Sequence, residues 1–263
     1  MNISKNLKGI VLAGGEGKRL RPLSYYFQKC MIPIGHNQKP LLEYIIRLLS
    51  YHNIDDILLL SGYKHEQISN YFNSGNRFGV NIEYLLDNPE LKGTGGSVLN
   101  AYQSGLTDSC EDLIIYYGDI ISDINLTKML KQHKKSGSMA TLAVSRGFKV
   151  GVGVAEVNRG YVVSWTEKPT LKIDVGIGIL ILKTRALQEL KHLNKSHMNL
   201  DIMSHLIPHL IQKGKTVHAY LTNAFWYDVG SVERYEKLDN GTIEKRFEYI
   251  FSKKDVESLL IQS

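Results

Sequence analysis

Short apolar runs alternate with helical segments through the first 120 residues, and this order constrains the fold more than any other feature of the sequence. The apolar runs end in glycine or polar residues, as buried parallel strands do, and the segments between them carry apolar residues at helical spacing. We expect a mostly parallel sheet with helices on both faces, whose ligands lie beyond the carboxyl ends of the strands. The expected strands are residues 9–13, 56–60, 81–86 and 113–117, and the expected helices 41–49, 64–72 and 96–104.

After about residue 137 the pattern changes to strands with few helices between them. Antiparallel or mixed strands are predicted here, added to the sheet as a smaller second lobe. Neither a repeat nor a linker interrupts the chain, so we expect one α/β domain over residues 1–235, with halves at about 1–137 and 138–235, and a helical tail over 236–263. The later strands are predicted at 139–145, 153–158, 161–166, 175–182 and 216–221, with a helix at 200–212.

Composition and charge exclude several classes of protein. Hydrophobic residues make up 43% and charged residues 22% of the chain, which are ordinary globular values and not those of a disordered chain. The longest apolar runs are far below the ~20 residues of a membrane span, and the first residues lack the apolar stretch of a signal peptide. Two cysteines, Cys30 and Cys110, cannot build a disulfide framework or a four-ligand zinc site. We therefore expect a cytoplasmic protein with no membrane partner.

The net charge of +6 comes from scattered basic residues. Their densest run, residues 128–135, is interpreted as the polar face and end of a helix. Scattered cations favour a solvated surface or a phosphorylated small ligand over nucleic acid, so no nucleic-acid partner is expected.

A glycine-rich turn, residues 14–17, follows the first strand. Glycines there allow backbone N–H groups to approach a phosphate, and Lys18 and Arg19 follow as cations. The turn does not match the dinucleotide-binding motif, because Leu20 stands where the third glycine belongs and an acidic residue is missing about 20 positions on. This argues against an oxidoreductase that binds a dinucleotide.

The turn is one of several ordered motifs that together resemble the sugar-1-phosphate nucleotidyltransferases, over about residues 8–235. The resemblance implies an enzyme that makes a nucleotide sugar from a nucleoside triphosphate (NTP) and a sugar 1-phosphate, and releases pyrophosphate. It also implies a Rossmann-like, glycosyltransferase-A-like fold with a nucleotide-binding first half and a sugar-binding second half. The motifs are Ala13-Gly14-Gly15-x-Gly17-x-Arg19-Leu20-x-Pro22-Leu23 with Lys29, Lys39-Pro40-Leu41-Leu42-Glu43, Gly93-Thr94-Gly95-Gly96, Tyr117-Gly118-Asp119, Glu167-Lys168-Pro169 and Trp226-Tyr227-Asp228-Val229-Gly230.

The resemblance assigns roles to single residues. Arg19, Lys29 and Asp119 are the implied catalytic residues: Arg19 grips the β- and γ-phosphates and Lys29 contacts the α-phosphate. Asp119 and Asp228 are the implied ligands of Mg²⁺, a hard cation that takes carboxylate and phosphate oxygens. The implied nucleotide contacts are Leu12, Ala13, Gly14, Gly15, Glu16, Gly17, Lys18, Arg19, Lys29, Gly93, Thr94 and Gly118. The implied sugar-phosphate contacts are Gly153, Glu167, Lys168 and Gly178.

The form Gly93-Thr94-Gly95-Gly96 is similar to that of the guanylyltransferase branch, which includes mannose and heptose 1-phosphate enzymes. We therefore favour GTP with mannose 1-phosphate or a related sugar, and expect the glycine backbone and the Thr94 hydroxyl to read the base. A glucose-1-phosphate uridylyl- or thymidylyltransferase remains an alternative, as does a non-catalytic relative that binds a nucleotide sugar and regulates a partner. A homo-oligomer also stays open.

The sequence departs from the family pattern at two places. Gln28 and Cys30 flank Lys29 where the family commonly has prolines, so we expect a looser backbone beside the lysine. Gly176-Ile177-Gly178 stands where many members carry Asn-Ala-Gly, which removes one side-chain contact to the sugar and leaves the sugar's identity open.

Overall fold

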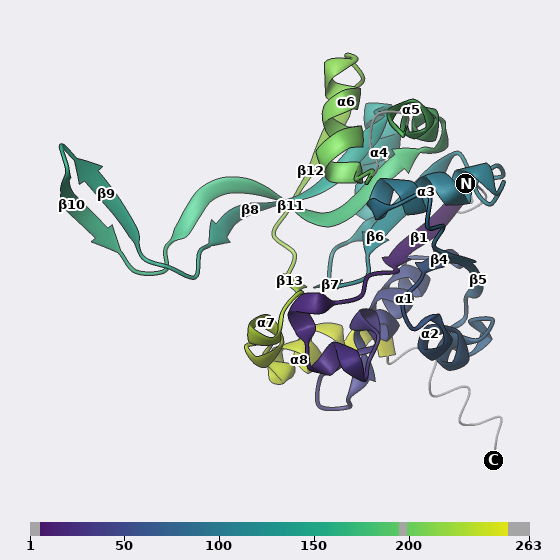
Figure 1. Cartoon of the computed structure of the whole chain (residues 1–263), viewed down its shortest axis with the longest axis horizontal. Coiled ribbons are helices and arrows are strands. Elements are labelled where there is room, and N and C mark those ends of the chain that lie inside the picture. The colour runs from purple at the N-terminus through teal and green to yellow at the C-terminus, as the bar shows by residue number, and fades with distance from the viewer. Residues whose placement is uncertain (1–5, 195–198, 252–263) are drawn as a thin grey trace.

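The computed structural model describes residues 6–194 and 199–251, and a seven-stranded sheet forms its centre (Figure 1). Six of the strands run in the same direction, because β1 pairs in parallel with β4 and β6, β4 with β5, and β12 with β8. β11 alone is reversed, and it pairs antiparallel with both β6 and β8. The predicted mostly parallel sheet is confirmed. In spatial order the strands are β12 (Val217–Thr222), β8 (Ala140–Lys149), β11 (Thr170–Lys183), β6 (Asp112–Tyr117), β1 (Leu7–Ala13), β4 (Asp56–Ser61) and β5 (Asn81–Leu86).

Helices cover both faces of the sheet. Successive strand residues point to opposite faces, so Val11 and Ile114 pack into one apolar cluster while Ile10 and Ile115 pack into another. α1, α2, α4 and α8 contribute to the first cluster, and α3, α5 and α6 to the second. The helices are α1 (Leu41–Tyr51), α2 (His65–Phe72), α3 (Gly93–Gln103), α4 (Leu126–Ser136), α5 (Leu187–Leu193), α6 (Ile207–Gln212), α7 (Val232–Glu236) and α8 (Asn240–Phe251).

Three two-stranded ribbons complete the described part of the chain. Short ribbons join β2 (Pro33–Ile34) to β3 (Lys39–Pro40) and β7 (Ile120–Ser122) to β13 (Trp226–Asp228). The third ribbon, β9 (Val154–Asn158) with β10 (Tyr161–Thr166), lies at the tip of a long projection (Figure 1). Within residues 6–194 and 199–251, no helix is both long and apolar enough to cross a membrane.

The smaller lobe expected after residue 137 is mainly a continuation of the central sheet. β8, β11 and β12 extend that sheet on the β6 side, so their inner halves belong to the same body as β1. Residues 146–174 extend away from the body, and we call this segment the arm. It consists of the outer parts of β8 and β11 together with the β9–β10 ribbon (Figure 1). The division of the chain into two halves stays a prediction.

The expected helical tail begins with α8, which packs against α1. Ile243 and Phe247 of α8 are buried, and the Phe247 ring meets the Tyr44 ring edge-on at 5.6 Å between centroids. The described part of the tail therefore shares the core of the main body. The remainder of the tail, residues 252–263, lies outside the described residues.

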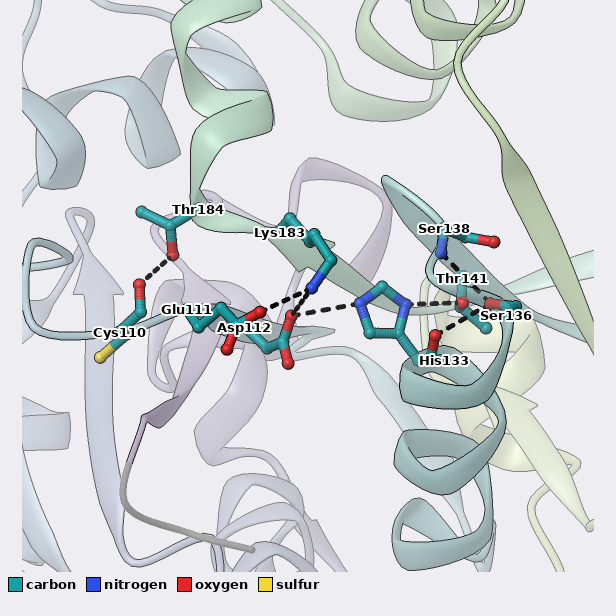
Figure 2. A network of polar contacts seen from close by, with 9 residues as sticks. All are labelled: Cys110, Glu111, Asp112, His133, Ser136, Ser138, Thr141, Lys183 and Thr184. Carbon is teal, nitrogen blue, oxygen red and sulfur yellow. Dashed lines mark hydrogen bonds and ion pairs between the residues drawn. The ribbon is translucent and has the colours of Figure 1, made fainter.

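The basic run at 128–135 contains a buried histidine. His133 is fully buried, because it continues the face of α4 formed by Leu126, Met129 and Leu130. Its Nδ1 lies 2.7 Å from Thr141 Oγ1 and its Nε2 lies 3.2 Å from Asp112 Oδ1 (Figure 2). The interpretation of this run as the polar face of a helix is wrong for His133, since a histidine with two polar partners can be buried.

The contact between His133 and Asp112 is part of a network at the amino end of β6 (Figure 2). Lys183 Nζ lies 3.2 Å from Asp112 Oδ1 and 3.0 Å from Glu111 Oε1. Burial opposes ionisation of Asp112, but the hydrogen bond from His133 and the charges of His133 and Lys183 outweigh it and lower the pKa of Asp112 below its ordinary 3.8. The network ties α4, β6, β8 and β11 together at the sheet edge opposite the carboxyl ends of the parallel strands.

Replacing Asp112 by Asn should lower the free energy of unfolding by about 3 kcal/mol at pH 7, because it removes one partner of a buried charged network. Since the folded pKa of Asp112 is depressed, its stabilisation is present above pH 3.8 and is lost as the pH falls through the folded value. Urea unfolding at pH 7 and pH 3 should therefore show the difference between wild type and Asp112→Asn shrinking at the lower pH.

Glu111→Gln is the matched control, since the Glu111 side chain is 65% exposed and touches the same lysine. We expect it to change stability by about 0.5 kcal/mol or less. Equal losses for the two variants at pH 7 would contradict the role given to Asp112.

Candidate active site

A cleft of about 390 Å³ opens at the carboxyl edge of the parallel strands. This is the edge where ligands of such sheets bind. A larger cavity of about 600 Å³ lies between α1 and α4, but it contains none of the predicted site residues. The residues that line the cleft come mostly from the ends of β1, β4, β5 and β6 and the start of α3: Leu12, Gly14, Gly15, Glu16, Lys29, Cys30, Leu60, Asp87, Gly93, Thr94, Ser97, Tyr117 and Asp119.

Two glycines allow the segments around the cleft to approach closely. Gly17 has φ +63°, and a Cβ on it would lie 3.2 Å from the Lys29 Cβ. Gly118 donates its N–H to the Leu12 carbonyl at 3.0 Å, and a Cβ on it would lie 2.7 Å from Cys30 Sγ. The end of β1, the Lys29 turn and the end of β6 therefore pack without a gap. The N–H of Gly118, one of the implied nucleotide contacts, thus already donates to a carbonyl within the protein.

Gln28 fixes the backbone beside Lys29. It is fully buried, its Nε2 donates to the Ala13 carbonyl at 2.5 Å, and its Oε1 accepts from the Cys30 N–H at 2.5 Å. Its own N–H donates to Gln67 Oε1 at 2.6 Å. The expected loosening of this turn stays a prediction, and these three hydrogen bonds act against it.

The two predicted metal-binding carboxylates lie at neighbouring strand ends. Asp119 follows β6, and Asp228 is the last residue of β13, paired with Ile120 of β7. The Val229 N–H donates to the Asp119 carbonyl at 2.9 Å. This antiparallel pairing brings together two residues that are far apart in the sequence.

Cations surround this pair of carboxylates unevenly. Lys29 Nζ forms an ion pair with Asp119, and Arg234 Nη1 donates to Asp228 Oδ2 at 2.8 Å. Burial, followed by the negative charge of Asp119, raises the pKa of Asp228 above its ordinary 3.8. The charges of Arg234, Lys29 and Arg19 oppose this shift without cancelling it. Arg19 itself is exposed on the turn formed by residues 18–20, where Lys18 Nζ lies 3.3 Å from Glu16 Oε2.

Asp228 Oδ1 supports a cation site. Among the described residues it is one of four buried side-chain polar atoms without a hydrogen-bond partner. A buried carboxylate oxygen that has no donor, beside a second carboxylate, is suited to a hard divalent cation. Residues 6–194 and 199–251 contain no group of three or more His, Cys, Asp or Glu that could hold a metal. Two carboxylates would thus leave coordination positions for phosphate oxygens and water, as Mg²⁺ prefers.

Asp87 is a cleft residue that our sequence reasoning missed. It follows β5, and a Cβ on Gly14 or Gly62 would come within 1.9 Å or 2.4 Å of its Oδ2. Ser97 Oγ donates to its Oδ1 at 2.8 Å. The strand-end argument applied to Asp119 could have found it, because Asp87 directly follows the predicted strand 81–86.

The Gly93-Thr94-Gly95-Gly96 motif is held to the segment before α6. The Thr94 hydroxyl donates to Asp201 Oδ2 at 2.8 Å and accepts from the Ile202 N–H at 3.0 Å. The N–H groups of Gly95 and Gly96 donate to the Leu200 carbonyl at 2.8 and 3.2 Å. The Thr94 hydroxyl is therefore engaged with Asp201, which the sequence reasoning did not single out, although Gly93 and Thr94 still line the cleft.

The predicted sugar-phosphate residues are not gathered at this cleft. Gly178, with φ +72°, packs at its wall, where an added Cβ would lie 3.3 Å from Tyr117 Cβ. Gly153, Glu167 and Lys168 lie on the arm instead and do not line the cleft. Lys168 Nζ lies 3.9 Å from Glu167 Oε1, and both side chains are largely exposed.

The Rossmann-like sheet brings a glycine-rich turn, Lys29 and Asp119 to one cleft, with Asp228 beside Asp119, and this arrangement is suited to the transfer of phosphorus-containing groups. Residues 8–245 match the sequence model of the family described as Nucleotidyl transferase, and the chain belongs to this family. The predicted family membership is confirmed. The family acts on NTPs and sugar 1-phosphates, and it generally uses a divalent metal ion.

The chain is similar to members with different substrates in their names. It is 30% identical over 236 residues to D-glycero-α-D-manno-heptose 1-phosphate guanylyltransferase of Aneurinibacillus thermoaerophilus, covering 88% of this chain and 96% of that protein. It is 28% identical to UTP–glucose-1-phosphate uridylyltransferase of Synechocystis sp., covering 93% of this chain and 65% of the relative's length. A Bacillus anthracis structure solved with sucrose gives a TM-score of 0.71 at 20% identity, covers 88% and 93% of the two chains, and agrees in fold.

The Asp119–Asp228 pair generates a prediction about metal binding. Asp228→Asn should weaken Mn²⁺ binding, measured by calorimetry, at least about tenfold, because it removes one of two anionic ligands. EDTA should abolish turnover of the wild type and Mg²⁺ should restore it. Asp108→Asn, in an exposed loop, is the charge-matched control and should bind Mn²⁺ as the wild type does. Full turnover in a chelated assay would contradict the metal site.

Proposed function

We propose that this protein transfers a guanylyl group from GTP to the phosphate of mannose 1-phosphate or a related sugar 1-phosphate, with Mg²⁺, and releases pyrophosphate. The observation that carries the proposal is the cluster of Lys29, Asp119 and Asp228 beside the glycine-rich turn. Phosphoryl-type transfers need positioning and charge neutralisation more than covalent chemistry, and this cluster supplies both.

In the proposed reaction a sugar-phosphate oxygen attacks the α-phosphorus of GTP. The bond from the α-phosphorus to the bridging oxygen breaks, and pyrophosphate leaves with that electron pair. The attacking phosphate oxygen is already anionic near neutral pH, so no general base is required. Lys29 would stabilise the charge that develops on the α-phosphate, and Arg19 would hold the departing phosphates. A divalent ion held by Asp119 and Asp228 would neutralise phosphate oxygens when bound.

Asp87 supports guanine over uracil and thymine. An ionised carboxylate only accepts hydrogen bonds, and guanine presents two neighbouring donors, N1–H and N2–H₂, on one edge. Uracil and thymine present a single N3–H between two carbonyl oxygens, which a carboxylate would repel. One hydrogen bond from Ser97 leaves acceptor capacity on the Asp87 carboxylate for the base.

The alternatives make different demands on these residues. A uridylyl- or thymidylyltransferase would use the same phosphate cluster but would gain nothing from Asp87. A non-catalytic nucleotide-sugar-binding relative would gain nothing from the buried, unpartnered Asp228 Oδ1. A screen of pyrophosphate release with five NTPs against several sugar 1-phosphates separates the proposed function from these two alternatives. We expect the highest kcat/KM for GTP with mannose 1-phosphate or a related sugar. Release with no substrate pair would support the non-catalytic alternative.

Lys29→Met should lower kcat by about 10²–10³, the scale of losing one preorganised donor, because the ammonium acts most strongly as charge develops. NTP affinity should change less, since Arg19 and the glycine turn remain. Steady-state kinetics beside a thermal melt test this. Lys131→Met, an exposed lysine on α4, controls for loss of charge. An unchanged kcat in folded Lys29→Met would remove this lysine from the mechanism.

Asp87→Asn should lower kcat/KM for GTP about 10- to 100-fold, corresponding to the 1–3 kcal/mol of a bidentate base contact. The value for UTP should stay level or rise, because the repulsion from the uracil carbonyls is relieved. Glu90→Gln removes an exposed charge three residues away and should leave the GTP-to-UTP ratio unchanged. If Asp87→Asn also leaves the GTP-to-UTP ratio of kcat/KM unchanged, that result would argue that another residue reads the base.

A further inference from the structure

The arm, residues 146–174, extends well beyond the carboxyl edge of the sheet (Figure 1). β11 pairs with both β6 and β8 in the body, but from Gly176 back to Thr170 its described partner is β8 alone. Phe148 stacks on Trp226 at 6.3 Å between ring centroids, which anchors the root of the arm to β13. Farther out, the β9–β10 ribbon stands away from the body (Figure 1).

The ribbon has one apolar face and one more polar face. Cross-strand partners share a face, so the pairs Val162–Val157 and Trp165–Ala155 lie together on one side. The bulge between Val162 and Ser164 keeps Trp165 on that side. The opposite side carries the pairs Glu156–Ser164, Asn158–Tyr161 and Val154–Thr166.

The apolar face is open to solvent. Val157, Val162 and Trp165 are 62%, 61% and 62% exposed. An isolated two-stranded ribbon is only marginally stable in water, and a contiguous exposed apolar face marks an interaction surface. The ribbon therefore has the composition of a docking element.

The arm also carries the predicted sugar-phosphate residues away from the cleft of their own chain. Lys168 and Glu167 lie at the base of the ribbon, with side chains 58% and 61% exposed. Gly178, at the cleft wall, lies ten positions after Lys168, about 30 Å along an extended strand. The cleft within one chain is thus built without these two residues.

We propose that the arm docks on a second copy of this chain and brings Lys168 and Glu167 to the sugar-phosphate end of that copy's cleft. The ammonium of Lys168 pairs there with the sugar's phosphate, and Glu167 accepts hydrogen bonds from sugar hydroxyls. What the cleft binds rests on the proposed function. Docking itself rests on the exposed face of the ribbon.

A second copy fits the arm better than an unrelated partner for two reasons. The cleft of a second copy lacks the same two residues that the arm presents, so exchange completes both sites at once. Reciprocal exchange also uses the same two surfaces twice and gives a closed two-fold dimer. The 29 residues of the arm are enough to supply one side of a standard interface, which has ~20–30 residues.

The first experiment measures association by light scattering. We expect the wild type to be a dimer, and Val162→Lys, on the apolar face, to weaken dimerisation at least about tenfold, because it places a charge in a desolvated contact. Ser164→Lys, on the opposite face, should remain a dimer. Both positions are exposed, so folding should survive, and a thermal melt checks this. A monomeric wild type, or equal effects of the two variants, would overturn the docking proposal.

The second experiment tests whether the site is shared between copies. Lys29→Met and Lys168→Ala chains with different tags are co-expressed, and the mixed dimer is isolated by two affinity steps. If arms act across the dimer, one of its two sites has both lysines, and the mixed dimer should have about half of the wild-type activity. If each arm serves its own cleft, both sites lack a lysine, and activity at the level of the two parent dimers would overturn the proposal.

Kinetics of the association variant give an independent readout. Val162→Lys should raise KM for the sugar 1-phosphate and leave KM for the NTP nearly unchanged, although Val162 lies far from the bound substrate. Lys168→Ala should show the same one-sided loss. Equal losses for both substrates would count against the shared site. A wild type that dimerises but releases no pyrophosphate with any substrate pair would instead refute the proposed function alone.

Discussion

The site depends on holding two carboxylates side by side in a partly buried place. Burial opposes the charge on Asp228, and repulsion from Asp119 adds to that cost, which is why the pKa of Asp228 is raised. The pairing of β13 with β7 and the hydrogen bond from Val229 to Asp119 fix this geometry. Lys29 and Arg234 offset part of the repulsion, and one buried oxygen of Asp228 is left for a further cation.

The scaffold around these charges is stabilised at a distance from them. At the amino end of β6, Asp112, His133 and Lys183 form a satisfied polar network between strands and α4. At the other end of the same strand, Gly118 packs on Leu12 and Cys30 so closely that no side chain fits. The amino end of β6 therefore contributes stability. Its carboxyl end holds charges whose mutual repulsion works against stability. This division is common where a rigid sheet supports a reactive site.

The arm explains an otherwise incomplete arrangement. The phosphate-binding cluster and Asp87 lie in the body, whereas Glu167 and Lys168 lie on a ribbon whose apolar face is exposed. Both features have the same origin, because β8 and β11 continue as a pair beyond the edge of the sheet. A second chain that covers the ribbon would remove the exposed apolar area and supply the missing residues together.

The sequence by itself determined the strand–helix alternation, the burial of the parallel strands, and the order of the motifs that identify the family. These follow from local rules: side-chain period, the conformational freedom of glycine, and the placement of ligands at strand ends. Only the tertiary structure decided that β11 runs against its neighbours, that Gln28 hydrogen-bonds to the backbone around Lys29, and that Thr94 is engaged by Asp201. It also decided that Asp87 reaches the cleft and that Lys168 does not. Each of these depends on contacts between residues distant in the chain, and periodicity reports which side of an element is buried without reporting what packs against it.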